Sequence, residues 1–459
     1  MRRRNKKIIL IMMFGDTILL SAALWTALSL RTYGSAQEKL DLFYLHVVPF
    51  FIIFVLWTLA IGAFGLYEPR IMKNGRVFLY RLMQVMGLNV IMAITVLYLF
   101  PFAIEPRRNL LAIAILATLF IFLWRYLFNL FIARAGAARL LFCGITPEAI
   151  MLVDFMRTHP QLGYAAAGFI AGDTAACQPP ASIPCFTLHK NTLSHIVRDA
   201  RADIIVIAPE MKNDKTLVSA LLAVIPQGIA VLEFPALHEM LTGKVPHSLI
   251  AEVWFLENLI GIKKPLYERI KRIADVAMAT ILGIPTLAIS PVIAAAVLLS
   301  SGRPIFFRQK RVGRGGKTFE IIKFRSTWRT SVPEHEGWDR GSDGSVYTRV
   351  GVFLRKSYLD ELPQLINIFR GDMSFVGPRP ERPEFVERLK NETPFYEMRL
   401  LVPPGLTGWA QINMENDAAV ADTPEKMQYD LYYIKNRAMM LDLLVLLRTA
   451  SALLRRQGR

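Results

Sequence analysis

Four long apolar segments fill the first third of the chain and limit what it can fold into. They cover about residues 8–30, 43–66, 82–102 and 110–132. Each exceeds the ~20 residues that a helix needs to cross the hydrocarbon core of a bilayer. The first segment is too long for a signal peptide and lacks a small-residue cleavage site. The sequence therefore predicts a four-helix transmembrane bundle over residues 1–135.

The basic residues around these segments predict how the bundle is oriented. Eleven Lys and Arg lie at the N-terminus, between the second and third segments, and after the fourth, whereas four lie in the other two loops. The positive-inside rule then places both ends of the bundle in the cytosol. An apolar content of 53% with a net charge of +17 is typical of a chain that contacts a membrane and an anionic partner.

Two charged residues interrupt the apolar segments, Asp16 in the first and Arg125 in the fourth. A charge inside the membrane marks a functional site by default. We expect instead that Asp16 finds a polar partner within the bundle and that Arg125 extends to the cytosolic face. No further run of acids or histidines indicates a proton path, which argues against a transporter.

The middle of the chain, residues 136–262, alternates short apolar strands with helices. This rhythm predicts a Rossmann-like domain with a parallel sheet. A dinucleotide site needs G-x-G-x-x-G after the first strand, but residues 144–149 contain one glycine, Gly144. A structural or regulatory domain is favoured over a cofactor-binding one. The predicted strands cover 140–143, 168–171, 203–208 and 229–234, and the first helix covers 147–158.

A fifth apolar run covers about residues 273–299 and contains Pro285, Ser290 and Pro291. Both of its flanks are basic, so both ends are expected in the cytosol. Proline kinks a helix, and the serine hydroxyl can satisfy a carbonyl that proline frees. The run therefore predicts a re-entrant hairpin that dips into one leaflet, and the alternative is a true fifth crossing.

Cations are concentrated around this hairpin. Residues 263–329 hold fourteen Lys or Arg and three acids. Guanidinium forks match phosphate oxygens, and Lys adds a point charge. Many arginines with few histidines therefore predict a site that handles phosphate groups.

Several short motifs follow the hairpin, each weak when taken singly. Adjacent carboxylates, Asp360 and Glu361, diverge by ~100° on a helix, so one can attack while the other holds a metal. The other motifs are Lys323-Phe324-Arg325-Ser326, Thr348-Arg349-Val350-Gly351 leading to Arg355, Gly377-Pro378-Arg379-Pro380, and Pro403-Pro404-Gly405-Leu406-Thr407-Gly408-Trp409.

In this order and spacing, the motifs closely resemble the bacterial sugar transferase family of polyprenyl-phosphate hexose-1-phosphate transferases. The resemblance covers about residues 265–459 and includes "KFRS", "YLDELPQL", "GDMSFVGPRP" and "PPGLTGWAQIN". It implies that residues 263–459 form a monotopic, α-rich catalytic domain at the cytosolic face of the bacterial inner membrane. The preceding bundle and Rossmann-like domain look like those of the large family members, and the C-terminal sequence looks most like members of exosortase-associated exopolysaccharide systems.

The resemblance implies that a sugar-1-phosphate passes from a UDP-sugar to undecaprenyl phosphate, with release of UMP, at the start of exopolysaccharide or O-antigen-type assembly. Asp360 would be the nucleophile of a covalent phosphosugar intermediate, and Asp360 and Glu361 would hold Mg²⁺. Asp442 matches a family acid of less certain role. The positions that match phosphate-binding residues of the family are Lys323, Arg325, Arg355 and Arg379.

The implied partners are membrane lipid, later glycosyltransferases and a flippase, with no nucleic acid and with a homodimer left open. The sequence departs from the family before Thr348, where residues 341–347 lack a usual arginine and a polar insert precedes them. This insert is a candidate mobile lid. The identity of the sugar is left open.

Two other functions compete with sugar-phosphate transfer as interpretations of the sequence. A nucleotide-sugar dehydratase or epimerase needs the dinucleotide fingerprint and a Tyr-x-x-x-Lys pair, which the middle domain does not offer. A non-catalytic scaffold that binds lipid phosphate in a polysaccharide assembly complex would carry the same basic hairpin. The sequence feature that argues against the scaffold is the Asp360–Glu361 pair in its motif.

Overall fold

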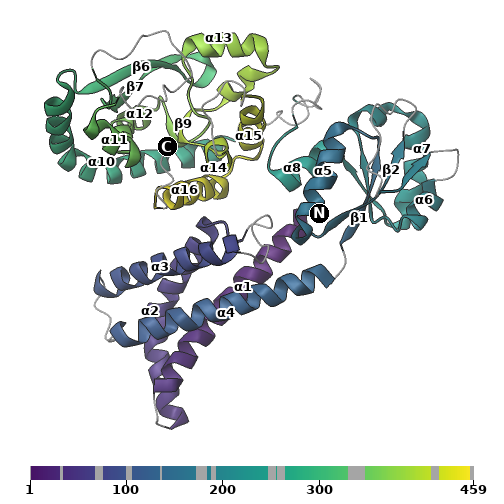
Figure 1. Ribbon diagram of the computed structural model, residues 1–459, viewed down its shortest axis with the longest axis horizontal. Helices are drawn as coiled ribbons and strands as arrows, with labels where there is room; N and C mark the ends of the chain where they lie inside the picture. Colours follow the sequence, from purple (N-terminus) through teal and green to yellow (C-terminus); the bar gives the residue numbers. More distant parts are fainter. Residues whose placement is uncertain are drawn as a thin grey trace. The chain divides into compact units, whose positions relative to one another are not determined.

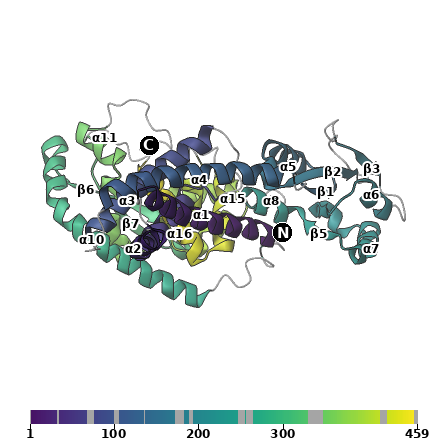
Figure 2. The same ribbon diagram turned by 90° about the horizontal axis from the view of Figure 1, so that it is seen from below.

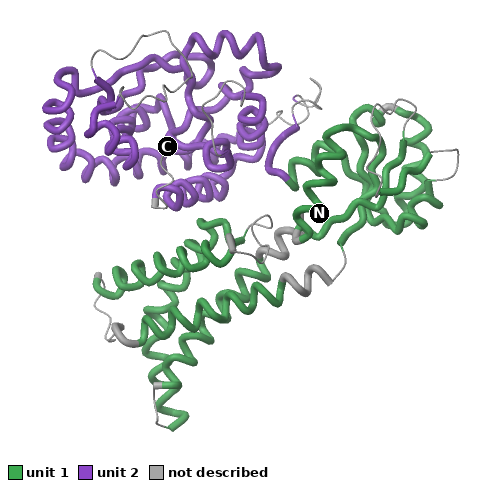
Figure 3. The backbone as a smooth tube through the Cα atoms, in the orientation of Figure 1, with its two compact units in different colours: residues 1–241 green, residues 242–459 purple. Residues whose placement is uncertain are grey.

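A computed structural model of the chain forms two compact units, residues 1–241 and residues 242–459 (Figure 3). The predicted division into 1–135, 136–262 and 263–459 stays a prediction. The polar insert of residues 330–345 and two of the basic flanking residues, Arg70 and Lys73, lie outside the described residues. The structure describes residues 2–31, 35–67, 76–99, 106–134, 137–171, 183–187, 193–246, 255, 264–328, 347–414 and 423–454.

The first unit begins with four long helices, in agreement with the four apolar segments. Figure 1 shows α1 and α4 running side by side, and α2 and α3 also pack against each other. All four are long and apolar enough to cross a membrane, and a fifth helix, α10, meets the same criterion. The bounds are Arg2–Arg31 for α1, Ala36–Ala63 for α2, Arg76–Leu99 for α3 and Pro106–Arg134 for α4.

The two charges inside the bundle meet each other. Arg125 Nη2 lies 2.5 Å from Asp16 Oδ2, and both side chains are buried. The expectation of a polar partner for Asp16 is confirmed, but the expectation that Arg125 extends to the membrane surface is wrong. A carboxylate one helix away is a stronger partner for a guanidinium than a distant interface, because the pair forms several charge-assisted hydrogen bonds.

The predicted parallel sheet is confirmed, with five strands in the order β3-β2-β1-β4-β5. This order occurs in doubly wound nucleotide-binding folds, and the assignment to the Rossmann-like class stays a prediction. The short β3 was not predicted. The strand bounds are Ala138–Cys143 for β1, Tyr164–Ala171 for β2, Cys185–Thr187 for β3, Ile204–Ile207 for β4 and Ala230–Glu233 for β5.

Helices cover the sheet, and the loop after β1 is tight. Gly144 has φ +101°, and a Cβ there would lie 2.7 Å from the Cβ of Ala208. Close packing and a left-handed backbone therefore account for this glycine without a cofactor. The helices are α5 (Pro147–Thr158), α6 (Leu193–Asp199), α7 (Lys215–Val224) and α8 (Phe234–Thr242), with α6 and α7 sharing one apolar core against the sheet.

The second unit packs one long helix, α10, and many short elements around an apolar core that includes Ile321, Ile368, Phe375 and Tyr433. The strands β6 and β7 form an antiparallel hairpin, whereas β8 and β9 pair in parallel. Its elements are α10 (Pro265–Ser301), β6 (Phe306–Val312), β7 (Thr318–Phe324), α11 (Arg349–Lys356), η7 (Leu359–Glu361), α12 (Gln364–Arg370), β8 (Ser374–Val376), α13 (Pro383–Glu392), η8 (Tyr396–Leu401), β9 (Gly405–Thr407), α14 (Trp409–Asn413), α15 (Thr423–Asn436) and α16 (Met439–Leu454).

Helix α10 is bent rather than interrupted. Its helical assignment continues through Pro285 and Pro291, and Figures 1 and 2 show two limbs that meet at an angle. The Ser290 hydroxyl donates to Thr286 O at 2.7 Å. Pro291 cannot donate to the carbonyl of Leu287, which is the residue after Thr286. The serine therefore does not satisfy the carbonyl that this proline frees, contrary to what the sequence predicts. Hydroxyl bonds to the preceding turn also bend helices, so this bond and the prolines act together.

Candidate active site

The strand β7 and the turn η7 bring the predicted dyad next to a lysine. Lys323 Nζ lies 2.7 Å from Glu361 Oε1, and both side chains are largely buried. The apolar side chains of Leu359 and Leu362 pack on the cluster that contains Phe324. This packing fixes the turn against the strand, so the lysine of one motif meets the carboxylate of another.

The dyad lies on a single turn of 3₁₀-helix rather than on an α-helix. Neighbouring side chains then diverge by ~120°, because a 3₁₀-helix has three residues per turn. Glu361 is directed to Lys323, and Asp360 projects in a different direction from the same turn. Tyr358, which precedes the turn, has φ +56°. A non-glycine residue in the left-handed region is strained, and such strain is common at functional sites.

Asp360 is 9% exposed, and its environment favours the protonated acid more than water does. Burial, helped by the neighbouring Glu361, raises the pKa of Asp360 to about 6, although Lys323 and Arg355 act in the opposite direction. Among the described residues, no cation forms an ion pair with Asp360. The carboxylate is therefore desolvated, and near neutral pH its oxygens are available to a substrate.

Two predicted phosphate residues, Arg355 and Arg379, belong to the same electrostatic group. Arg355 lies over the ring of Tyr347, with 4.4 Å from Cζ to the ring centroid. Burial lowers the pKa of Lys323, and the positive charge of Arg379 lowers it further. Two carboxylates and three cations thus interact in one region, a charge balance suited to phosphate.

Close backbone contacts explain the glycines of two motifs. Thr348 caps α11 by accepting a hydrogen bond from Gly351 N at 2.8 Å. A Cβ on Gly351 would collide with Ser326 O, at the end of the Lys323 motif. A Cβ on Gly377 would likewise collide with Pro403 O. Each glycine lets two motifs that are distant in sequence meet at the site.

Arg325 makes different contacts from the other predicted phosphate residues. Its Nε donates to Thr327 O at 3.2 Å and its Nη1 to Arg303 O at 3.3 Å. These bonds hold the loop between α10 and β6 against the end of β7. Its role in binding phosphate stays a prediction.

Asp442 contacts residues of neighbouring helices and not the Asp360–Glu361 dyad. Its carboxylate accepts hydrogen bonds from Tyr267 at 2.7 Å and Tyr433 at 2.8 Å, and it pairs with Lys271 at 2.9 Å. These partners lie on α10 and α15, so Asp442 fastens α16 to both.

Trp409 is also a packing residue, because its ring stacks on Tyr432 with centroids 5.3 Å apart.

The donor set of the dyad suits Mg²⁺. This ion usually takes one or two carboxylates and completes its shell with water and substrate phosphate. Asp360 offers oxygens that no cation occupies among the described residues, and Glu361 is adjacent. In the described part of the chain, no group of three His, Cys, Asp or Glu side chains is placed to hold a metal ion.

The family model described as bacterial sugar transferase matches residues 266–456. The exopolysaccharide production protein ExoY of Sinorhizobium fredii is 33% identical over 222 residues, which cover 94% of that protein and 45% of this chain. The chain belongs to the bacterial sugar transferase family. The motifs of Lys323, Arg355, Asp360 and Arg379 all lie inside the matched region.

Two longer relatives of the family extend the comparison. The UDP-N-acetylgalactosamine-undecaprenyl-phosphate N-acetylgalactosaminephosphotransferase of Aeromonas hydrophila is 41% identical, over 49% of this chain and 52% of its own length. The UDP-glucose:undecaprenyl-phosphate glucose-1-phosphate transferase of Klebsiella pneumoniae is 31% identical, over 68% of this chain and 66% of its own length. The matched part of the chain thus spans between about half and two thirds of these relatives.

Sequence reasoning missed a set of buried charges beside the Gly377–Pro380 turn. They are dispersed along the chain in segments that are themselves polar or charged, so no pattern in the sequence singles them out. The members are the buried Glu381, Arg399, Lys426 and Asp430, with Arg311, whose side chain is 19% exposed.

Proposed function

We propose that the protein transfers a sugar-1-phosphate from a UDP-sugar to undecaprenyl phosphate at the cytosolic face of the bacterial inner membrane. The observation that carries the proposal is the buried, unpaired Asp360 beside the Lys323–Glu361 pair and Arg355. The names of the Aeromonas and Klebsiella relatives support the donor and acceptor classes, and the ExoY relative supports a role at the start of exopolysaccharide assembly.

The reaction would proceed by double displacement. An Asp360 carboxylate oxygen attacks the phosphorus that bears the sugar, forming an acyl-phosphate and breaking the bond to the departing UMP. A phosphate oxygen of undecaprenyl phosphate then attacks the same phosphorus. This second step releases the lipid diphosphate sugar and returns Asp360 to its carboxylate form.

The cations of the site would stabilise charge on the transferring phosphate. Lys323, Arg355 and Arg379 act on the phosphate oxygens, where phosphoryl transfer depends on positioning and electrostatics. Asp360 and Glu361 would hold Mg²⁺, which would neutralise part of the charge on the diphosphate. Chelation with EDTA should then abolish turnover, and added Mg²⁺ should restore it.

The contacts of α10 support a re-entrant helix over a fifth crossing. Ala279, before the bend, packs in the core with Ile321, whereas Val297, after the bend, packs with Phe324 and Leu354. Both limbs therefore return to one compact domain. Between them, large apolar side chains are exposed, as expected for a tip inserted into one leaflet. These are Ile281, Leu282, Ile284, Leu287, Ile289 and Val292.

The test is UMP release by the purified protein in detergent or liposomes. A panel of UDP-sugars with Mg²⁺ is assayed with and without undecaprenyl phosphate, and Asp360→Asn is the control. We expect lipid-dependent release from one sugar and none in the variant. A sub-stoichiometric burst of UMP without lipid is the expected sign of the covalent intermediate. Binding of lipid phosphate without release from any UDP-sugar would favour the scaffold instead.

A further inference from the structure

A cluster of buried charges lies beneath the turn that carries Arg379. Three cations and two anions come from four separate segments of the second unit. The side chains of Arg399 and Lys426 are each 4% exposed, and that of Asp430 is 2% exposed. We name these five residues the turn network: Arg311, Glu381, Arg399, Lys426 and Asp430.

Two arginines of the turn network hold successive carbonyls of the turn, and the backbone of the neighbouring Val312 holds the carbonyl that follows. Arg399 Nη2 donates to Arg379 O at 2.9 Å, and Arg311 Nη1 donates to Pro380 O at 3.0 Å. The backbone N of Val312 donates to Glu381 O at 2.9 Å. Proline fixes φ in this turn but leaves ψ free, so the carbonyl anchors determine its remaining freedom.

The cations of the turn network lie beside its acids, and Arg311 Nη1 is 3.7 Å from Glu381 Oε2. Arg399 Nη2 also lies 3.0 Å from Asp430 Oδ2, and Lys426 Nζ lies 2.6 Å from Glu381 Oε1. Although burial acts in the opposite direction, Lys426 and Arg399 hold the pKa of Glu381 below its ordinary value. Glu381 is therefore held in its ionised form beside Lys426 and the two arginines.

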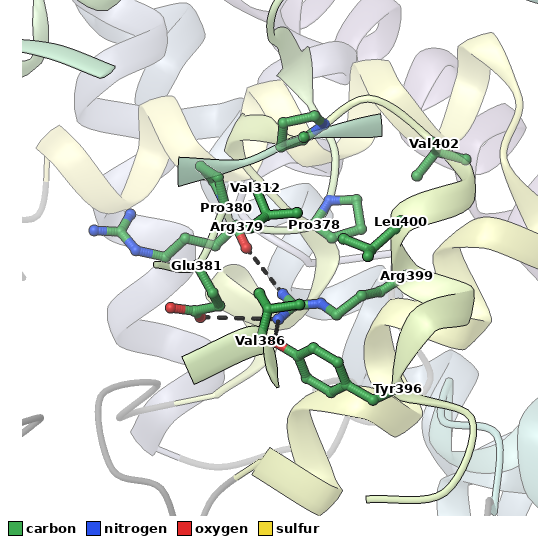
Figure 4. Close-up of a pocket in the computed structure, with 12 residues that line it drawn as sticks. Val312, Pro378, Arg379, Pro380, Glu381, Val386, Tyr396, Arg399, Leu400 and Val402 are labelled. Carbon is green, nitrogen blue, oxygen red and sulfur yellow. Dashed lines mark hydrogen bonds and ion pairs between the residues drawn. The ribbon is translucent and has the colours of Figure 1, made fainter. Parts of the chain in front are cut away.

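Such a network is costly to bury and is weak evidence for stability, because apolar side chains of similar volume often stabilise a fold as well. What an ionic network adds is a defined geometry. Figure 4 shows the Arg379 side chain extending away from Arg399, while its carbonyl is held by Arg399. Burial is the main cause of the lowered pKa of Lys323, and the positive charge of Arg379 adds to it.

We propose that Arg399, with Arg311, is a positioning residue that fixes the Gly377–Pro380 turn and so aims Arg379 at the diphosphate of the nucleotide sugar. The proposal rests on the proposed function for its substrate. Lysine cannot replace Arg399 fully, because a single ammonium lacks the planar fork that binds Asp430, the Tyr396 hydroxyl and the Arg379 carbonyl together.

The test is a double-mutant cycle between Arg399→Lys and Arg379→Ala, measured by UMP release. Lysine keeps the buried charge, so the variant is designed to fold. We expect Arg399→Lys to raise the KM for the UDP-sugar by about tenfold with kcat changed by less than about threefold. In the Arg379→Ala background, Arg399→Lys should raise the KM no further, because Arg399 acts through Arg379.

Arg388→Lys is the matched control, since Arg388 pairs with Glu392 on the exposed face of α13. It should leave the KM unchanged. An unchanged KM in Arg399→Lys, or the same rise with and without Arg379, would refute the positioning role. If Arg399→Lys lowers the melting temperature so far that the protein cannot be assayed, Arg311→Lys replaces it in the same cycle, with the same expected and refuting results.

Direct binding of UDP, measured by calorimetry, separates this proposal from the proposed function. A wild-type protein that binds UDP without releasing UMP from any donor would refute the transfer alone, and the dissociation constant would then replace the KM in the cycle. A wild-type protein that binds no uridine nucleotide would overturn both.

Discussion

Two of the buried carboxylates, Asp16 and Asp360, differ in their partners. In the bundle, Asp16 accepts hydrogen bonds from Arg125 Nε at 3.3 Å, from Arg125 Nη2 at 2.5 Å and from the Tyr67 hydroxyl at 2.8 Å. In the second unit, Asp360 is also buried, but the nearby Lys323 is paired with Glu361. One carboxylate is enclosed by partners, whereas the other is desolvated and left available.

This difference is the one expected between a structural acid and the reactive acid that we propose Asp360 to be. Partners occupy the lone pairs of Asp16, so its charge stabilises the arrangement of α1 and α4 and has little capacity for attack. Asp360 is buried without an ion pair to any described residue, which costs folding free energy but leaves its oxygens free for the nucleophilic role proposed above. Burial alone therefore does not identify a functional acid, and the partners of the buried group do.

The largest effect is expected for Asp360→Asn. Turnover should fall by about 10⁴-fold, because the amide oxygen cannot form the acyl-phosphate. The melting temperature should stay the same or rise, since a pKa raised from 3.8 to about 6 corresponds to up to about 3 kcal/mol against the folded state at neutral pH. UMP release and thermal unfolding measure both, with the exposed Glu387→Gln as control. Retained turnover would exclude Asp360 as nucleophile.

The bundle pair should respond in the reverse way. Arg125→Met should destabilise the protein by about 3–5 kcal/mol, because it leaves Asp16 buried without its cation. The double variant Asp16→Leu with Arg125→Met should recover most of this loss. Thermal unfolding in detergent measures each variant. Equal destabilisation of the single and double variants would show that the pair is not a closed structural unit.

Lys323→Met should lower kcat/KM by about 100-fold, because it removes a cation from the transferring phosphate. The double variant with Glu361→Gln should recover thermal stability but not turnover. This result would distinguish the catalytic pair from the bundle pair, for which removing both charges is sufficient. Recovery of turnover in the double variant would assign Lys323 a structural role only.

The smallest effect is the pH dependence. The rate of UMP release should rise about tenfold per pH unit below pH 6 and level off above it, because Asp360 must lose its proton to attack. Lys323→Met should move the midpoint to higher pH, since Lys323 lowers the pKa of Asp360. A profile that is flat between pH 5 and pH 8 would contradict the raised pKa.

Patterns along the chain predicted the helices and strands that depend on the residues of a single segment. Apolar runs predicted α1 to α4, and the alternation of strands and helices predicted the parallel sheet. The strands β3, β6, β8 and β9 were not predicted. The register of β6 pairs residues such as Phe306 and Phe324, which are distant along the chain. Sheet partners of this kind provide no periodic signal in one segment.

The candidate site was predicted in its residue types but not in its contacts. The motifs supplied Asp360, Glu361, Lys323, Arg355 and Arg379, and the structure brings these side chains into one electrostatic group. The turn network was not predicted. Its members come from β6, η8, α15 and the turn after β8, and no motif connects them. Motifs are recognised by spacing along the chain, whereas ion pairs depend on distance in space.

The sequence by itself determined the apolar segments, the excess of positive charge, and the family through its ordered motifs. Only the tertiary structure decided that Arg125 neutralises Asp16 while Lys323 neutralises Glu361 and leaves Asp360 unpaired. The physical reason is that pairing and pKa depend on groups within a few ångströms. Asp16 and Arg125 are 109 positions apart, and packing of α1 against α4 brings them together.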